Sequence, residues 1–208
     1  ITSIGERAFE KCSKLKSLSL SDNLTTIGKQ AFQECQGLTS ISDTNVTFTK
    51  LSSLGPNAFY KSGITTFPLG ASTPLQEIPE NAFYQSKLTG ITIPDAVTTL
   101  GNNAFRMSDS AAAGTPSTLK KVNISDKSKL QTIGEYAFYD ASFGYVWLPS
   151  TVTTISAHAF GINASACVLD LTGIKSVPTV SDNAFNSLYP SSANIIYFDS
   201  GTISAAFT

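Results

Sequence analysis

Apolar side chains return along this chain at a nearly regular spacing. The dipeptide Ala-Phe marks each return, at steps of mostly 22 to 27 residues with one of 33, and its phenylalanines are Phe9, Phe32, Phe59, Phe83, Phe105, Phe138, Phe160 and Phe185. Two further aliphatic positions precede every Ala, one by four residues and the other by seven. A period in the twenties is typical of a solenoid in which each repeat forms one coil.

A second pattern follows most of these phenylalanines and predicts a short strand. Apolar residues recur there as L-x-x-L-x-L, for example Leu88, Ile91 and Ile93, and the last two enclose one polar residue. This alternation is the period of two expected of a β-strand. One such strand in every coil would build a parallel sheet along one wall. The segment Gly5–Cys12 lacks alternation, and its apolar spacing predicts a short helical turn on the opposite wall.

Composition narrows the classes of partner. The chain has 208 residues, of which 41% are apolar and only 14% charged, and its formal net charge is -1. Nucleic acids and anionic membranes are bound through basic surfaces, so neither is an expected partner. No apolar run reaches the length of about 18 residues that spans a bilayer, and we expect no membrane insertion within this segment.

Catalytic and metal-binding motifs are missing from the sequence. Cys12, Cys35 and Cys167 are odd in number, and they do not pair with His158 at metal-ligand spacing. A column of Asp22, Asp95 and Asp126 could hold calcium, although Asp is also a common turn residue. We find no nucleophile motif or phosphate loop. The sequence therefore predicts no enzyme, no cofactor and no metal site.

The repeats resemble the BspA-type leucine-rich repeat family of bacterial surface proteins. The resemblance rests on stretches such as "LTGITIPDAVTTLGNNAF" (88–105) and "YVWLPSTVTTISAHAF" (145–160), and it extends over essentially the whole chain. It implies an α/β fold, namely a right-handed leucine-rich-repeat solenoid with a concave parallel sheet and short helical turns on the convex side. We expect about eight coils in a single domain, residues 1–208, that begins in the middle of a repeat. The family also implies an extracellular or cell-surface location and adhesion as the proposed role.

The outward-facing side chains of the predicted strands give the candidate site. In the first four coils they are mostly small or polar, whereas the last three coils carry Tyr145, Trp147, Val168, Asp170, Ile195 and Tyr197. Clustered exposed aromatic residues are unusual on a soluble surface and are frequent in binding hot spots. We expect these residues to bind an extracellular protein or a glycan, without catalysis.

Two alternatives remain open at this stage. The aromatic cluster could pack against a cap, a neighbouring domain or a second copy of the chain, and a different strand register would bury it. The segment could also be a structural spacer without its own ligand. The sequence does not define the oligomeric state.

Overall fold

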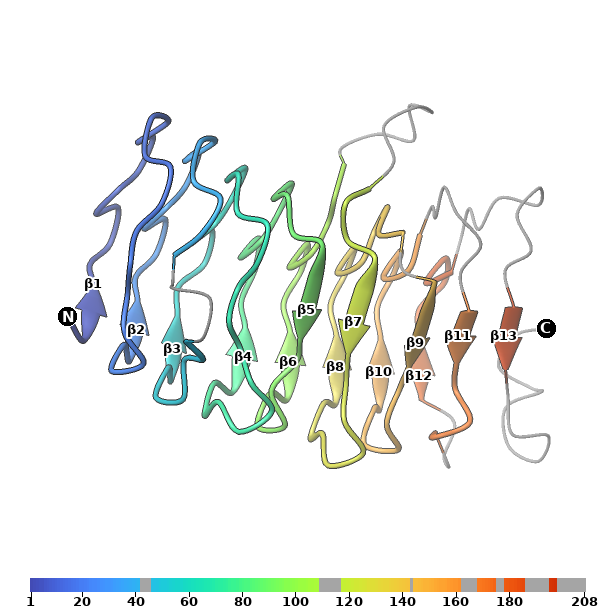
Figure 1. Cartoon of the computed structure of the whole chain (residues 1–208). Coiled ribbons are helices and arrows are strands. Elements are labelled where there is room, and N and C mark those ends of the chain that lie inside the picture. The colour runs from blue at the N-terminus through green and yellow to red at the C-terminus, as the bar shows by residue number, and fades with distance from the viewer. Residues whose placement is uncertain are drawn as a thin grey trace.

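The computed structural model describes residues 1–41, 46–108, 117–142, 144–161, 168–174, 178–185 and 195–197. The described segments form a stack of coils in which β1 lies at one end and β13 at the other (Figure 1). Within the described ranges the elements are thirteen short strands and no helix: β1 (Ser3–Ile4), β2 (Thr26–Ile27), β3 (Ser53–Leu54), β4 (Glu77–Ile78), β5 (Gly90–Thr92), β6 (Thr99–Leu100), β7 (Lys121–Asn123), β8 (Thr132–Ile133), β9 (Tyr145–Trp147), β10 (Thr154–Ile155), β11 (Val168–Asp170), β12 (Thr179–Val180) and β13 (Ile195–Tyr197). The predicted parallel-sheet solenoid is therefore confirmed.

The strands form two columns along the stack. The predicted column contains β5, β7, β9, β11 and β13, whose hydrogen-bonded pairs are all parallel. The other column contains two-residue strands that precede each Ala-Phe, and it comprises β1, β2, β3, β4, β6, β8, β10 and β12. This second column was not predicted from the sequence, because two residues are too few to show an alternation. Apolar side chains from both columns enter one core.

A stack of phenylalanine rings runs through that core. Phe83 and Phe105, in successive coils, lie with ring centroids 5.4 Å apart and planes inclined by 1°. The same stacked contact joins each Ala-Phe ring to the next from Phe9 to Phe185, at 5.1 to 5.9 Å. The Ala side chains from Ala31 onward are buried beside them. Each coil thus buries its apolar side chains mainly against its two neighbours, as in other repeat proteins.

The wall that carries Ala-Phe is built from turns, so the predicted helical turns were wrong. Alternate backbone amides donate to the next coil, as Phe9 does to the carbonyl of Ala31 at 2.8 Å. The amides between them close local turns, as Glu10 does on the carbonyl of Arg7 at 3.0 Å. The residue before each Ala has a positive φ, from 54° at Arg7 to 63° at Asn183. An α-helix requires negative φ at every residue, so these positive φ angles exclude a helix. The turns nevertheless keep the apolar spacing that had suggested a helix.

Glycine allows adjacent coils to approach closely after the two-residue strands. A Cβ at Gly28, Gly55, Gly101 or Gly134 would lie 2.2 to 2.7 Å from backbone atoms of the preceding coil. The glycine amides also continue the ladder, as Gly101 does by donating to the carbonyl of Ile78 at 2.8 Å.

Pro79 interrupts this column because proline has no amide proton to donate. It occupies the same position as Gly55 and Gly101. The sheet changes there: β3 belongs to the three-stranded sheet, and β4 begins the five-stranded one. A cavity of about 290 Å³ opens between them, lined by residues 52–54 and 74–77.

Candidate binding face

The predicted candidate residues occupy three neighbouring strands in the predicted register. Val168 pairs with Tyr145 on one side and with Ile195 on the other. Asp170 pairs in the same way with Trp147 and Tyr197. We call the outward side of β9, β11 and β13 the strand face. Backbone pairing therefore places the six residues in two columns across these strands; the side chains of Val168, Ile195 and Tyr197 lie outside what the structure describes.

Tyr145 is held in place on this face by a neighbouring coil. Its side chain is 53% exposed, yet its hydroxyl donates a 2.6 Å hydrogen bond to Oδ2 of Asp170. The other carboxylate oxygen, Oδ1, accepts bonds from the amide of Thr172 at 2.9 Å and from its hydroxyl at 2.6 Å. The phenol is thus an exposed but oriented group, fixed by a carboxylate that is itself fixed by a turn.

The charge on Asp170 follows from these contacts. Partial burial alone would raise the pKa of its carboxyl, but the hydrogen bonds from Thr172 and Tyr145 outweigh burial and lower it. The same hydrogen bond from Tyr145 to Asp170 raises the pKa of the phenol. At neutral pH the face therefore presents one carboxylate and one protonated phenol.

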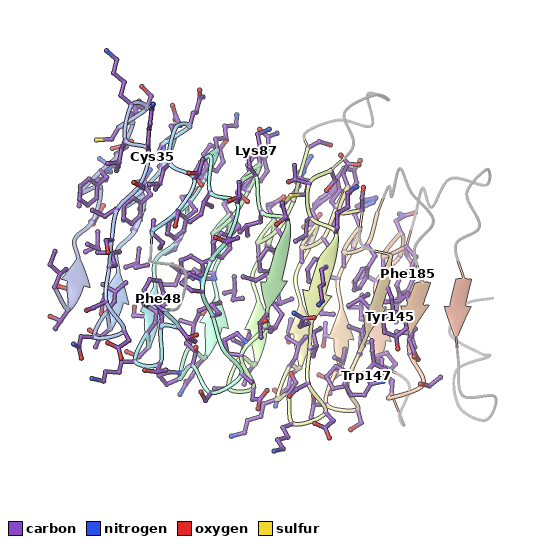
Figure 2. The ribbon with its side chains drawn as sticks, in the orientation of Figure 1. Cys35, Phe48, Lys87, Tyr145, Trp147 and Phe185 are labelled. Carbon is purple, nitrogen blue, oxygen red and sulfur yellow. The ribbon has the colours of Figure 1, made fainter. Side chains whose placement is uncertain are left out.

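Trp147 is half-buried at the lower end of the same strand (Figure 2). Its indole lies against Gly173, where an added Cβ would come within 2.7 Å of the ring. The absence of a side chain at Gly173 therefore makes room for the flat ring over the following turn. The indole thus packs over this turn and remains partly exposed.

A second group of aromatic side chains, on the wall of turns, was missed by the sequence analysis. The Arg106 guanidinium lies 4.7 Å from the ring centroid of Tyr136 and 5.0 Å from that of Tyr139. Tyr60 stacks on Tyr84 with centroids 4.8 Å apart. The recurring letters "AFY" at Tyr60, Tyr84 and Tyr139 were the available signal. These rings contact one another and Arg106, so the group acts first as packing.

The described residues contain neither a cluster of metal ligands nor a membrane-spanning helix. Among the described residues no group of three or more His, Cys, Asp or Glu side chains could hold a metal ion. Asp95, from the column considered for calcium, accepts a hydrogen bond from the Ser125 hydroxyl at 2.5 Å. Over the same described ranges no helix has the length and apolar character needed to cross a bilayer.

Stacked coils with parallel strands, a phenylalanine stack and one Ala-Phe turn per coil define a leucine-rich-repeat solenoid. More specifically, the chain belongs to the BspA-type leucine-rich repeat family. The model of that repeat region matches residues 1–112 and 109–204, in six copies where the sequence analysis counted about eight coils. No curated protein matches the chain.

Solved bacterial leucine-rich-repeat structures have a similar fold. A leucine-rich repeat protein from Eubacterium ventriosum is 23% identical, with a TM-score of 0.57 over 88% of this chain and 48% of its own. The pneumococcal vaccine antigen PcpA is 21% identical, with a TM-score of 0.51 over 86% of this chain and 38% of its own. A leucine rich cell surface protein from Faecalibacterium prausnitzii is 22% identical, with a TM-score of 0.45 over 95% and 59%. The chain therefore spans less than two thirds of each of these proteins.

Proposed function

We propose that this chain is a non-catalytic binding module displayed on a bacterial cell surface, and that it binds an extracellular protein or glycan through the strand face. Membership in the BspA-type family supports the surface location. The observation that carries the binding role is the exposed, hydrogen-bonded Tyr145 beside Trp147. Among the described residues, only Ile1 and Tyr145 are large hydrophobic side chains that are exposed.

The geometry of Tyr145 suits binding because it limits the entropy lost in a complex. A tyrosine that is already oriented gives up little rotational freedom when a partner covers it. Its ring offers apolar area, and Asp170 next to it offers a fixed hydrogen-bond acceptor. An aromatic ring beside a carboxylate is suited both to a sugar ring with hydroxyl groups and to a polar protein loop.

The experiment is a binding screen of the purified chain against immobilised extracellular-matrix proteins and a glycan array. Trp147 is the one tryptophan of the chain, so its fluorescence reports directly on contact at the strand face. We expect the double variant Tyr145→Ala, Trp147→Ala to lose binding of a ligand found in the screen.

The matched control is Lys121→Ala, Asn123→Ala on β7, which alters the same two outward columns one coil earlier. It should retain binding. Equal binding by both variants would place the site elsewhere. If neither matrix proteins nor glycans bound the parent chain, the segment would be a spacer.

A further inference from the structure

A polar pocket lies at the edge of the solenoid away from Trp147, where Figure 2 labels Lys87. The chain turns a corner there between the Ala-Phe wall and the next strand. Leu38 follows Phe32 by six positions at this corner in the second coil, but Ile64 follows Phe59, and Leu88 follows Phe83, by only five. The two shortened corners adjoin a pocket of about 440 Å³. That volume is within the range of small-ligand sites, about 300–1,000 Å³.

The side chains that line this corner pocket are of polar or positively charged residues. The lining consists of Gln36, Lys61, Ser62, Gly63, Gln85 and Lys87, with neither a carboxylate nor an apolar side chain among them. In the described part of the chain, neither lysine forms an ion pair. The Lys61 ammonium lies 5.3 Å from the centroid of the Tyr60 ring, a contact that places the charge without neutralising it.

Recognition in this pocket falls mainly to side chains, because several lining residues already use their backbone amides. The amide of Lys61 donates to the carbonyl of Tyr84, and that of Gln85 donates to the carbonyl of Arg106, each at 2.7 Å. Gly63 donates to the carbonyl of Cys35 at 3.0 Å. Two ammonium groups and two carboxamides are left to make contacts, and the glutamines can both donate and accept.

Ser62 adds a buried polar group whose hydrogen-bonding capacity is unused. It is 2% exposed, and its hydroxyl has no partner among the described residues. Cys35 holds the equivalent position one coil earlier, and its thiol donates to the carbonyl of Phe9 at 2.8 Å. Ser86 occupies the same position one coil later, and its buried hydroxyl also has no partner among the described residues, whereas most buried polar groups in proteins are paired.

We propose that the corner pocket binds an acidic saccharide, a sugar that carries a carboxylate or sulfate group. Lys61 and Lys87 pair with the anionic group, and the carboxamides of Gln36 and Gln85 bind the ring hydroxyls. A peptide is the less suitable occupant, because the lining has no apolar side chain to anchor one. The site is separate from the strand face and does not depend on the function proposed for it.

Isothermal titration calorimetry of the purified chain tests this site. The ligands are a heparin tetrasaccharide, which carries sulfate and carboxylate, an oligogalacturonate, which carries carboxylate alone, neutral cellotetraose, and a hexaglutamate peptide. We expect at least one acidic saccharide to bind, with an affinity that falls as salt is added, and cellotetraose not to bind. Oligogalacturonate binding identifies carboxylate as sufficient, whereas binding of heparin alone identifies sulfate as the group recognised.

The variant Lys61→Gln, Lys87→Gln should weaken this binding about tenfold or more, because both charge-assisted contacts are lost. Glutamine suits position 61, since Gln30 and Gln85 adopt a positive φ like that of Lys61. The control Lys127→Gln, Lys129→Gln removes the same charge from exposed positions and should bind like the parent. The Tyr145→Ala, Trp147→Ala variant should also bind like the parent.

Four outcomes would overturn the proposal. They are no binding of either acidic saccharide, equal weakening by the two lysine pairs, hexaglutamate binding as tight as that of the saccharides, and loss of binding in the Tyr145→Ala, Trp147→Ala variant. The last outcome would move the saccharide to the strand face and so separate the two proposals.

Discussion

The hydroxyl of Tyr145 donates a 2.6 Å hydrogen bond to Asp170 across adjacent strands, so an exposed aromatic ring of the strand face is tied to the next coil. Neither residue is a repeat-defining position. The bond is one of the features by which β9 and β11 differ from the more regular coils before them, where the same columns carry Gly90, Thr92, Lys121 and Asn123. Differences between coils, rather than the shared repeat, therefore distinguish one part of this surface from another.

The first prediction concerns the titration of this pair. The hydrogen bond raises the pKa of the Tyr145 phenol, so Asp170→Asn should lower that pKa toward the ordinary value of about 10. Absorbance near the tyrosinate band, compared with that of Tyr145→Phe, identifies the group. An unchanged phenol titration in Asp170→Asn would contradict the hydrogen bond.

The same pair gives stability a defined pH dependence. The pKa of Asp170 is lowered in the folded chain, so its contribution is present above the unfolded value of about 3.9 and is lost as pH falls through the lower, folded value. Tyr145 acts in the opposite direction: its contribution is present below about pH 10 and is lost as pH rises through its raised pKa. In urea unfolding, the stability of Asp170→Asn should therefore lack the loss that Asp170 contributes as pH falls.

The second prediction concerns the phenylalanine stack. Phe83→Ala removes a fully buried ring that stacks on Phe59 and Phe105, and it should destabilise the fold by about 3–5 kcal/mol. Phe9→Ala is the matched change in the first coil, where the ring is half-buried and stacks on Phe32 alone. It should cost about 1 kcal/mol. Urea unfolding measures both, and equal costs would argue against nearest-neighbour stabilisation.

The third prediction uses two glycines that occupy equivalent positions but have different surroundings. A Cβ at Gly101 would lie 2.5 Å from the backbone nitrogen of Glu80, whereas a Cβ at Gly5 meets nothing within 4 Å. Gly101→Ala should therefore destabilise by about 1–3 kcal/mol because two coils must separate. Gly5→Ala should be neutral or stabilising by up to about 1 kcal/mol, since alanine restricts the unfolded chain. Thermal unfolding of the two variants decides whether close coil contact or backbone freedom selects glycine.

The sequence predicted the parts of the fold that depend on repetition. The Ala-Phe period defined the coils, and the alternation through Ile91, Val122 and Val146 predicted both the strands and the register that pairs Tyr145 with Val168 and Trp147 with Asp170. A single helical turn and a series of tight turns give the same pattern of apolar positions around Ala8 and Phe9. The pattern therefore did not distinguish the two structures, and the predicted helical turns were wrong. Only backbone φ separates the two, and Arg7 and Asn103 do not reveal a positive φ by residue type alone.

The two candidate sites also differ in whether the sequence could predict them. The strand face was predictable because aromatic residues replaced small ones in an outward column. The corner pocket was not predictable, because Lys61 and Lys87 look like ordinary surface residues in the sequence. Only the folded arrangement of neighbouring coils and the length of the corner bring them to one pocket. The packing of Arg106 among Tyr84, Tyr136 and Tyr139 likewise depends on side chains from different coils.

The fourth prediction concerns the interruption at Pro79. Ser156 and Ser181 occupy the same column, and their amides donate to the carbonyls of Ile133 and Ile155 at 2.9 Å. Pro79→Ser supplies the missing amide opposite the carbonyl of Leu54, so hydrogen exchange at position 79 should be slow, as at Ser156. The global stability should change little, because one hydrogen bond contributes about 1 kcal/mol and loss of the proline ring costs about 0.4–1 kcal/mol. Exchange as fast as that of an exposed amide would show that the opening between β3 and β4 has a cause other than the proline. The neighbouring side chains of Pro74 and Leu75, which line the cavity, would then be the next positions to change.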